Sequence, residues 1–200
     1  MRLILFFNGW GMDENILKNL IIPKDWILKV INFPYEVVED LSKYEEIIYI
    51  GWSFGCHYLA KYLEENRVIS KKVVAINGHS ENLGKYGIPQ KMFDLTLTTL
   101  TPENLKKFYK NMGLEEEFIP ARDFNSIKDE LAYFKENFSP IKNPFSYAYI
   151  GENDRIIPAA RQIKFFEKNE VKPVLIKGEH YLFDRENLLE EIVERVTDEL

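Results

Sequence analysis

The sequence predicts an α/β fold: a six-stranded, mostly parallel sheet, doubly wound with helices on both faces. Short apolar runs of strand length recur along the chain, and segments with helical spacing separate them. The runs are nearly continuous in hydrophobicity, as expected of strands that are buried on both faces. The six expected strands are residues 3–7, 27–33, 47–50, 73–76, 147–150 and 173–176.

Three helices are expected to cover this sheet. They span residues 55–65, 158–168 and 185–198. In the last of them, the apolar residues recur at a spacing that places them on one stripe, namely Leu188, Leu189, Ile192, Val193 and Val196.

Residues 80–145 interrupt the alternation, because they contain no convincing strand. We interpret them as a helical cap inserted into a core made of residues 1–79 and 146–200. The pattern is equally compatible with a cap over a cleft and with an appendage that only packs against the core. Inside the insertion, Thr101 and Pro102 begin a helix that Gly113 ends.

A second helix of the insertion is expected at residues 129–137. No internal repeat is visible along the chain.

The charge balance argues against a nucleic-acid partner. The 200 residues include 26 Lys and Arg against 32 Asp and Glu, a formal net charge of −6. Proteins that bind nucleic acid through its phosphates need a basic face. No apolar run is long enough for a membrane span or a signal peptide, so no membrane partner is expected either.

Cysteine and histidine usage points to a reducing compartment and to chemistry without a metal. Cys56 is the single cysteine, which excludes an intrachain disulfide and a multi-cysteine zinc site. We therefore expect a cytoplasmic protein. The three histidines are scattered without the spacing of metal ligands, so we expect neither metal nor cofactor.

The third predicted strand runs into Gly51-Trp52-Ser53-Phe54-Gly55 and directly on into a helix. Gly-x-Ser-x-Gly between a strand and a helix is typical of a nucleophilic serine, because the glycines permit a tight turn that raises the hydroxyl above the sheet. The alternative is a turn that needs glycines and carries a capping serine. The apolar strand before it and the helix after it favour the nucleophile.

A serine at its ordinary pKa needs a base, and three histidines are candidates. His57 lies one turn inside the helix that follows Ser53, so we expect a structural role for it. His79 follows the fourth strand and could reach the cleft. His180 follows the sixth strand, at the carboxyl edge where the loops of such sheets converge. Position and chain order favour His180.

An acid should orient this base. Asp154 follows the fifth strand and lies between serine and histidine in the sequence, as in the α/β-hydrolase order. Glu152 and Glu81 remain rival acids, and an aspartate that leads a helix is common. The combination of Ser53, Asp154 and His180, each after a different strand, is more specific than any member alone.

Acyl transfer also needs N–H donors aimed at the oxyanion. Phe54 supplies one because it follows the nucleophile. The second is expected from Trp10, in the glycine-containing turn after the first strand. Alternatively, these glycines only form a turn and Trp10 only packs.

Four segments together resemble an α/β-hydrolase, and more narrowly the BioG type of pimeloyl-[acyl-carrier protein] methyl ester esterase. They are Asn8-Gly9-Trp10-Gly11-Met12, Gly51-Trp52-Ser53-Phe54-Gly55, Gly151-Glu152-Asn153-Asp154 and Gly178-Glu179-His180-Tyr181. The resemblance covers essentially the whole chain. It implies that Ser53 attacks the terminal methyl ester of a pimeloyl chain on acyl-carrier protein, in biotin synthesis, and releases methanol.

The resemblance also implies an apolar cleft and a docking surface for the carrier. We expect the cleft to be walled by Trp10, Met12, Trp52, Phe93 and Phe108. Acyl-carrier protein is generally acidic, so a local basic patch must offset the net charge of this chain. The candidates are Lys106, Lys107 and Lys110, with Arg122 and Lys128 nearby. A solvated helix face is the alternative explanation of these lysines.

Two other functions remain open on the sequence. One is a carboxylesterase or thioesterase with another acyl substrate, because a triad fixes reaction type better than substrate. The other is a non-catalytic module that binds a small molecule or a protein. The oligomeric state is not indicated by any pattern.

Overall fold

A computed structural model describes residues 1–198, and within them the strands form one six-stranded sheet. All neighbouring strands pair in parallel, so the sheet is wholly rather than mostly parallel. The strands are β1 (Arg2–Phe7), β2 (Trp26–Ile31), β3 (Glu46–Trp52), β4 (Val73–Ile76), β5 (Tyr147–Gly151) and β6 (Val174–Ile176). Each predicted strand is found, with ends that differ by at most two residues.

The strand order is β2-β1-β3-β4-β5-β6. The chain moves outward from β1 to β2 and then returns to the other side of β1 to form β3. Phe7 at the end of β1 pairs with Gly51 near the end of β3, so the two segments that follow these strands begin side by side. Ligands of open α/β sheets bind at such a switch point, outside the carboxyl ends of the strands.

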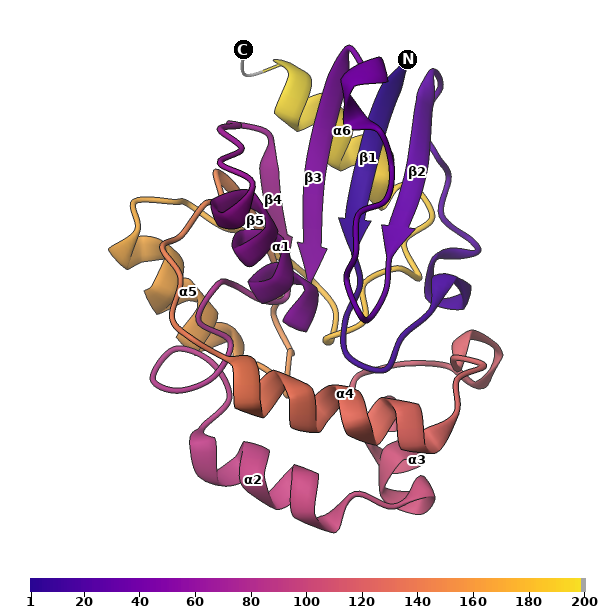
Figure 1. Ribbon diagram of the computed structural model, residues 1–200, viewed down its shortest axis with the longest axis vertical. Helices are drawn as coiled ribbons and strands as arrows, with labels where there is room; N and C mark the ends of the chain where they lie inside the picture. The colour runs from indigo at the N-terminus through magenta and orange to yellow at the C-terminus, as the bar shows by residue number, and fades with distance from the viewer. Residues whose placement is uncertain (199–200) are drawn as a thin grey trace.

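Helices cover the two faces of the sheet, as predicted. In Figure 1, α1 (Phe54–Glu65) lies in front of the strands and α6 (Leu188–Asp198) lies behind them. The predicted stripe of α6 is buried, and α5 (Ala159–Lys168) follows β5. Short 3-10 helices lie at Glu14–Leu17, where Ile16 and Leu17 are buried, and at Leu41–Lys43.

The 80–145 segment is helical and lies beyond the carboxyl ends of the strands (Figure 1). It contains α2 (Gln90–Thr99), α3 (Pro102–Asn111), a 3-10 turn (Glu116–Phe118) and α4 (Phe124–Asn137). The helix predicted after Thr101 is confirmed, because the Thr101 hydroxyl accepts from the N–H of Asn104 at 3.2 Å.

Two features of this segment differ from the prediction. Helix α2 was not predicted, and α4 begins five residues before the expected residue 129. The cap of α4 explains its early start, since the carboxylate of Asp123 accepts from the N–H groups of Asn125 and Ser126. Within residues 1–198, no helix combines the length and apolar character that crossing a bilayer requires.

Candidate active site

Ser53 occupies a strained turn between β3 and α1. Its backbone has φ 53° and ψ −126°, a conformation that a non-glycine residue adopts only when its surroundings enforce it. The turn also needs Gly55, because a Cβ there would lie 2.0 Å from the carbonyl oxygen of Phe7. The tight contact with β1 therefore fixes how the Ser53 hydroxyl projects from the sheet.

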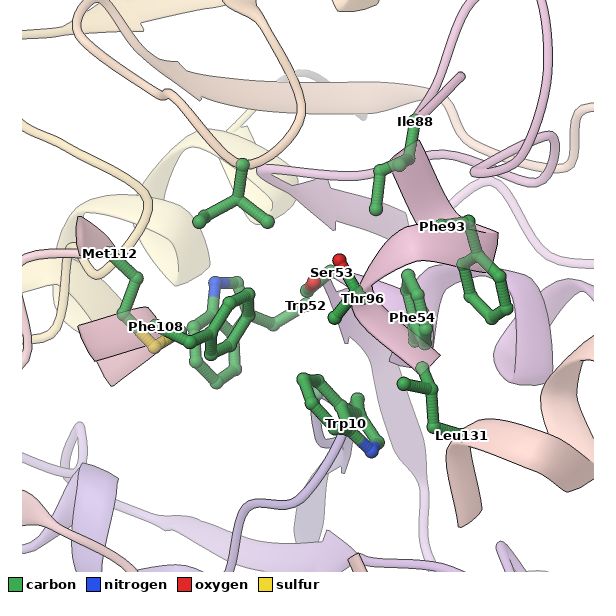
Figure 2. Close-up of a pocket in the computed structure, with 12 residues that line it drawn as sticks. Trp10, Trp52, Ser53, Phe54, Ile88, Phe93, Thr96, Phe108, Met112 and Leu131 are labelled. Carbon is green, nitrogen blue, oxygen red and sulfur yellow. The ribbon is translucent and has the colours of Figure 1, made fainter. Parts of the chain in front are cut away.

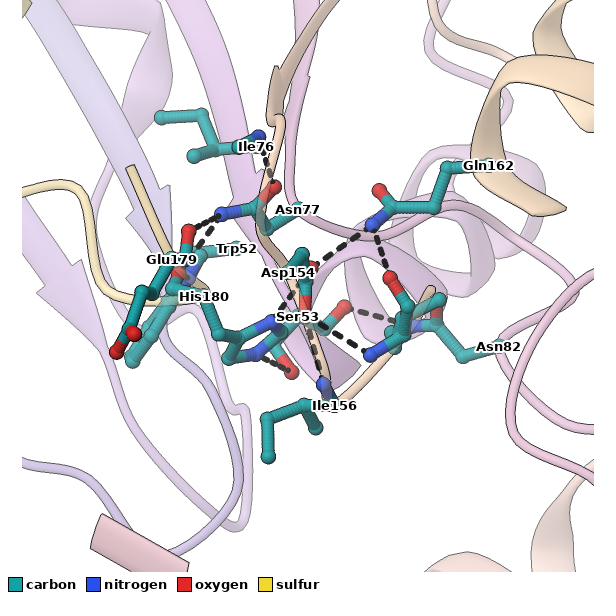
Figure 3. A network of polar contacts seen from close by, with 12 residues as sticks. Trp52, Ser53, Ile76, Asn77, Asn82, Asp154, Ile156, Gln162, Glu179 and His180 are labelled. Carbon is teal, nitrogen blue, oxygen red and sulfur yellow. Dashed lines mark hydrogen bonds and ion pairs between the residues drawn. The ribbon is translucent and has the colours of Figure 1, made fainter. Parts of the chain in front are cut away.

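The hydroxyl of Ser53 faces the imidazole of His180. Their Oγ and Nε2 atoms are 2.9 Å apart, although the two residues are 127 positions apart in sequence. Nδ1 of the same ring lies 2.8 Å from Oδ2 of Asp154. Since an ionised carboxylate only accepts, Nδ1–H donates to Asp154 and Nε2 is left free to accept the serine proton. Figure 3 shows this chain of contacts.

Asp154 is held by donors on both of its oxygens. Oδ1 accepts from the backbone N–H groups of Ile156 and Ile157 at 2.8 and 3.0 Å, and Oδ2 accepts from the Gln162 amide at 2.8 Å. The carboxylate is buried, so these bonds replace the water it loses. Gln162 was not predicted, although a glutamine on the apolar stripe of α5 was a signal for it.

The backbone of His180 is fixed by two side chains that were not predicted for this role. Its carbonyl oxygen accepts from the Asn77 amide at 2.8 Å and from the Trp52 indole N–H at 3.1 Å. Asn77 also accepts from the N–H of Gly151 at 2.7 Å. One buried amide thus ties β4, the end of β5 and the histidine loop together.

Among the described residues, the alternative bases His57 and His79 and the alternative acids Glu152 and Glu81 take no part in the hydrogen bonds between Ser53, His180 and Asp154. His57 bonds the carbonyl oxygen of Ser80, and His79 bonds that of Tyr86. Both rings are buried, and burial lowers the pKa of each. Within residues 1–198, no hydrogen bond joins Glu152 or Glu81 to the imidazole of His180.

The turn after β1 leaves one backbone N–H beside the serine. The N–H of Gly9 is bound by the Asn8 side chain, that of Gly11 by Glu130, and that of Met12 by the carbonyl oxygen of Gly9. In the part of the chain that the structure describes, the N–H of Trp10 has no acceptor.

Phe54 offers a comparable N–H, because the first N–H groups of a helix have no acceptor within it. Figure 2 shows the side chains of Trp10 and Phe54 around Ser53. Both residues line the same pocket as Ser53, and among the described residues neither N–H has an acceptor.

An apolar pocket surrounds Ser53 (Figure 2). Four of the five predicted wall residues line it, namely Trp10, Trp52, Phe93 and Phe108. The expectation for Met12 is wrong: its side chain is buried outside this lining, and Met112 of the 80–145 segment lines the pocket instead. Ile88, Thr96, Leu131 and Ile156 also line it and were not predicted.

The comparison with family models is decisive. Residues 1–191 match the model described as "Pimeloyl-ACP methyl esterase BioG". The chain belongs to the BioG family. A solved BioG from Haemophilus influenzae has the same fold, with a TM-score of 0.82 and 28% identity over 96% of this chain and 94% of that one.

Two further proteins are similar to this chain. A malonyl-[acyl-carrier protein] O-methyltransferase of Bacteroides fragilis is 32% identical over 196 residues, 89% of this chain. The chain spans 39% of the length of that relative. A lipase-esterase related protein of Clostridium acetobutylicum, at 15% identity over 100% of this chain and 94% of that chain with a TM-score of 0.66, shares the fold. The chain thus has an α/β-hydrolase fold.

The predicted basic patch on this BioG chain divides into exposed and buried members. Lys106, Lys107 and Lys110 are exposed on α3 and line a surface groove of about 890 Å3. The expectation for Arg122 as a docking residue is wrong, because its side chain is only 14% exposed and pairs with buried Glu130 at 2.6 Å. The charge of Arg122 is therefore paired inside the protein and is not presented to a partner.

Proposed function

We propose that this chain is a serine esterase that hydrolyses the methyl ester of pimeloyl-[acyl-carrier protein] in biotin synthesis, releasing methanol. The observation that carries the proposal is the Ser53–His180–Asp154 hydrogen-bonded chain in a protein of the BioG family. The unpaired N–H groups of Trp10 and Phe54 and the apolar pocket support it.

In this mechanism, Ser53 Oγ attacks the ester carbonyl carbon while His180 Nε2 takes the hydroxyl proton. The carbonyl oxygen becomes an oxyanion, and the N–H groups of Trp10 and Phe54 stabilise it. His180 then gives its proton to the departing methoxide, which leaves as methanol. A water molecule attacks the acyl-enzyme by the same steps in reverse, with His180 as base.

Asp154 acts by holding His180. Its carboxylate fixes Nδ1 as the protonated nitrogen and stabilises the imidazolium that forms when Nε2 accepts the serine proton. The donors from Ile156, Ile157 and Gln162 hold the carboxylate in place, aimed at the ring. These bonds therefore set the orientation that proton transfer requires.

The pocket suits an uncharged ester on an apolar chain, because tryptophan, phenylalanine and aliphatic side chains line it. Its free space of about 40 Å3 is far below the roughly 300 to 1,000 Å3 of ligand pockets. We infer that the 80–145 segment is a cap whose helices move outward to admit the acyl chain. The cap residues Phe93, Phe108 and Met112 line the pocket.

We propose that the carrier delivers the acyl chain through a second, smaller groove. It has about 240 Å3 of free space, lies between α2 and α3, and shares Thr96 and Phe108 with the pocket of Ser53. Lys107 lines this groove and also the larger groove next to it. Displacing Phe108 would therefore connect the nucleophile with a surface that bears lysines.

We propose acyl-carrier protein as the partner at this surface, with Lys106, Lys107 and Lys110 facing its acidic side. Glu115 and Glu116 line the same groove as these lysines, so the positive charge is confined to the α3 side. We assign the reaction to the cytoplasm, which the single, buried and free Cys56 supports.

Methanol release from the methyl ester of pimeloyl-[acyl-carrier protein] tests the proposal. We expect the wild type to prefer this ester over free short-chain esters and over acyl thioesters, and Ser53→Ala to release no methanol. A wild type that cleaves short free esters or thioesters at least as well would indicate a general esterase or thioesterase. A wild type without hydrolase activity on any of them would contradict an enzymatic role.

A further inference from the structure

Glu130 is a buried carboxylate on α4 that contacts the turn after β1 rather than the triad. Its side chain is 1% exposed. Oε2 accepts from the N–H of Gly11 at 3.2 Å and from the Arg122 guanidinium at 2.6 Å. Oε1 lies 3.1 Å from the hydroxyl of Tyr35, which is also 3.1 Å from the carbonyl oxygen of Asn8.

These contacts enclose the peptide that carries the Trp10 N–H. On one side, Tyr35 reaches the carbonyl oxygen of Asn8, two residues before Trp10. On the other side, Glu130 takes the N–H of Gly11, which directly follows Trp10. Glu130 therefore contacts both Tyr35 and Gly11, the residues that hold the turn on either side of Trp10. Through them it sets the orientation of the unpaired Trp10 N–H.

Helix α4 holds the same turn at a second point. The indole N–H of Trp10 donates to the carbonyl oxygen of Ile127 at 2.7 Å. Ile127 precedes Glu130 on α4 by three residues, so both contacts come from one face of the helix. Figure 1 shows α4 lying across the carboxyl ends of the strands, where it can make them.

Burial of the Glu130–Arg122 ion pair costs desolvation free energy, and packing alone does not explain why the pair is there. Burial raises the pKa of Glu130, and the Arg122 guanidinium opposes that shift. Buried ion pairs of this kind add little net stability compared with apolar residues of similar volume. What the carboxylate supplies is an acceptor at a defined position, which an apolar side chain cannot supply.

We propose that Glu130 is a positioning residue for the oxyanion site, holding the Trp10 N–H in place through Gly11 and Tyr35. The inference rests on the proposed function, since it assumes that the Trp10 N–H stabilises the oxyanion. It makes α4 part of the catalytic framework as well as of the cap. Misplacing an oxyanion donor weakens the transition state more than the bound ester.

Three variants separate positioning from folding. Glu130→Gln keeps one oxygen that can accept from both Gly11 and the Arg122 guanidinium, and it can turn its amide nitrogen toward the Tyr35 hydroxyl. Glu130→Met removes the acceptor but leaves the Arg122 charge buried and unpaired, so this variant alone would report on folding as well. The double variant Glu130→Met with Arg122→Met removes both charges and should fold.

We would measure kcat and KM on a small methyl ester, and the affinity for an alkyl boronic acid that forms a tetrahedral anion on Ser53. In the folded double variant we expect kcat and boronate affinity to fall at least about tenfold, up to the roughly 100-fold of a lost oxyanion donor. KM should stay within about twofold, because ester binding does not depend on this donor. Glu130→Gln should keep kcat within about threefold, because it retains the acceptor.

A folded double variant with wild-type kcat and boronate affinity would overturn the inference and leave Glu130 a structural residue. Equal losses in Glu130→Gln and the double variant would also overturn it, because the acceptor would then be irrelevant. Failure of the proposed function looks different: the wild type itself would neither hydrolyse the ester nor bind the boronate at Ser53.

Discussion

The side-chain amide of Asn77 donates to the carbonyl oxygen of His180 at 2.8 Å and to that of Glu179 at 3.0 Å. Asn77 stands directly after β4, and His180 lies in the loop after β6. The imidazole can face Ser53 only if its backbone is held there. The amide of Asn77 therefore connects the stability of the sheet to the position of His180, the base of the proposed mechanism.

Asn77→Asp tests this connection. The variant replaces two donors by a carboxylate oxygen that faces two carbonyl oxygens, so both carbonyls lose a bond and the new charge is buried. We expect the free energy of unfolding to fall by about 3 kcal/mol, and kcat to fall more than KM rises. Urea unfolding and steady-state kinetics on one methyl ester measure both effects.

The matched control is Asn66→Asp, in which an exposed asparagine at the end of α1 loses a donor to Tyr62. Its unfolding free energy should change by less than about 1 kcal/mol, since water replaces the bond. Equal effects of the two substitutions would contradict the role of Asn77.

Asp154→Asn should remove most activity without unfolding the protein. The N–H groups of Ile156 and Ile157 require an oxygen at the Oδ1 position, so the new amide nitrogen takes the place of Oδ2. There it faces His180 Nδ1, and the Gln162 amide loses this acceptor but keeps its bond to the carbonyl oxygen of Ile157. Nδ1 must then accept, Nε2 carries the proton, and the ring cannot take the proton of Ser53. The same change in a serine-protease triad lowers kcat about 10⁴-fold, and we expect a loss of that order here.

Kinetics on a small methyl ester would measure this loss, and circular dichroism would verify the fold. A variant that retains a tenth or more of wild-type kcat would show that Asp154 does not orient His180.

His79 should make stability fall with acid. Its Nδ1 accepts from the N–H of Glu81 while Nε2 donates to the carbonyl oxygen of Tyr86, so the ring is held neutral. Burial lowers the pKa of His79 to about 4, whereas an unfolded histidine titrates near pH 6.5. Between these values the unfolded chain binds a proton that the folded chain does not, so stability is lost as the pH falls.

Linkage gives a loss of about 2 kcal/mol between pH 7 and pH 5 from His79. Urea unfolding at both pH values, for the wild type and for His79→Phe, isolates this contribution. The variant should lose about 2 kcal/mol less than the wild type over this interval, whatever its absolute stability. An identical pH dependence in both proteins would refute the assignment.

Reversing the charge of Lys106, Lys107 and Lys110 to glutamate should raise KM for the carrier-bound ester and leave KM for a small ester unchanged. We expect a rise of about tenfold at low salt that shrinks as salt is added, because exposed charges are screened. Comparison of the two substrates at two salt concentrations measures the effect.

The control reverses three exposed lysines, Lys24, Lys71 and Lys172, which precede β2, β4 and β6 at the opposite edge of the sheet. It makes the same change in net charge and should leave both KM values unaltered. If both triple variants raise KM equally, docking at α3 is excluded and only net charge matters.

Features with local causes were predictable from the sequence. The turn at Ser53 follows from glycines between an apolar strand and a helix, and the helix after Thr101 follows from its cap and Pro102. Helix α2 was missed because it has no side-chain cap and Phe93 alone among its residues is fully buried. Phe93 packs against Phe54 of α1 and Phe134 of α4, which are other helices.

Contacts that depend on the assembled fold could not be predicted in the same way. Asn77 reaches His180 only because the ends of β4 and the β6 loop converge, and Glu130 reaches Gly11 only because α4 crosses the sheet edge. Met12 was misplaced because its position in the turn can be read from the sequence but the direction of its side chain cannot. Arg122 was misplaced because its partner lies a further eight residues along the chain, on a face of α4 that only packing buries.

Labelling with a fluorophosphonate probe tests whether His180 activates Ser53 as a nucleophile. We expect rapid labelling of the wild type at Ser53, located by peptide mass spectrometry. Ser53→Ala should not be labelled, and labelling of His180→Ala should be slower by about three orders of magnitude or more. A wild type that does not react, or a His180→Ala variant that reacts as fast, would contradict this activation.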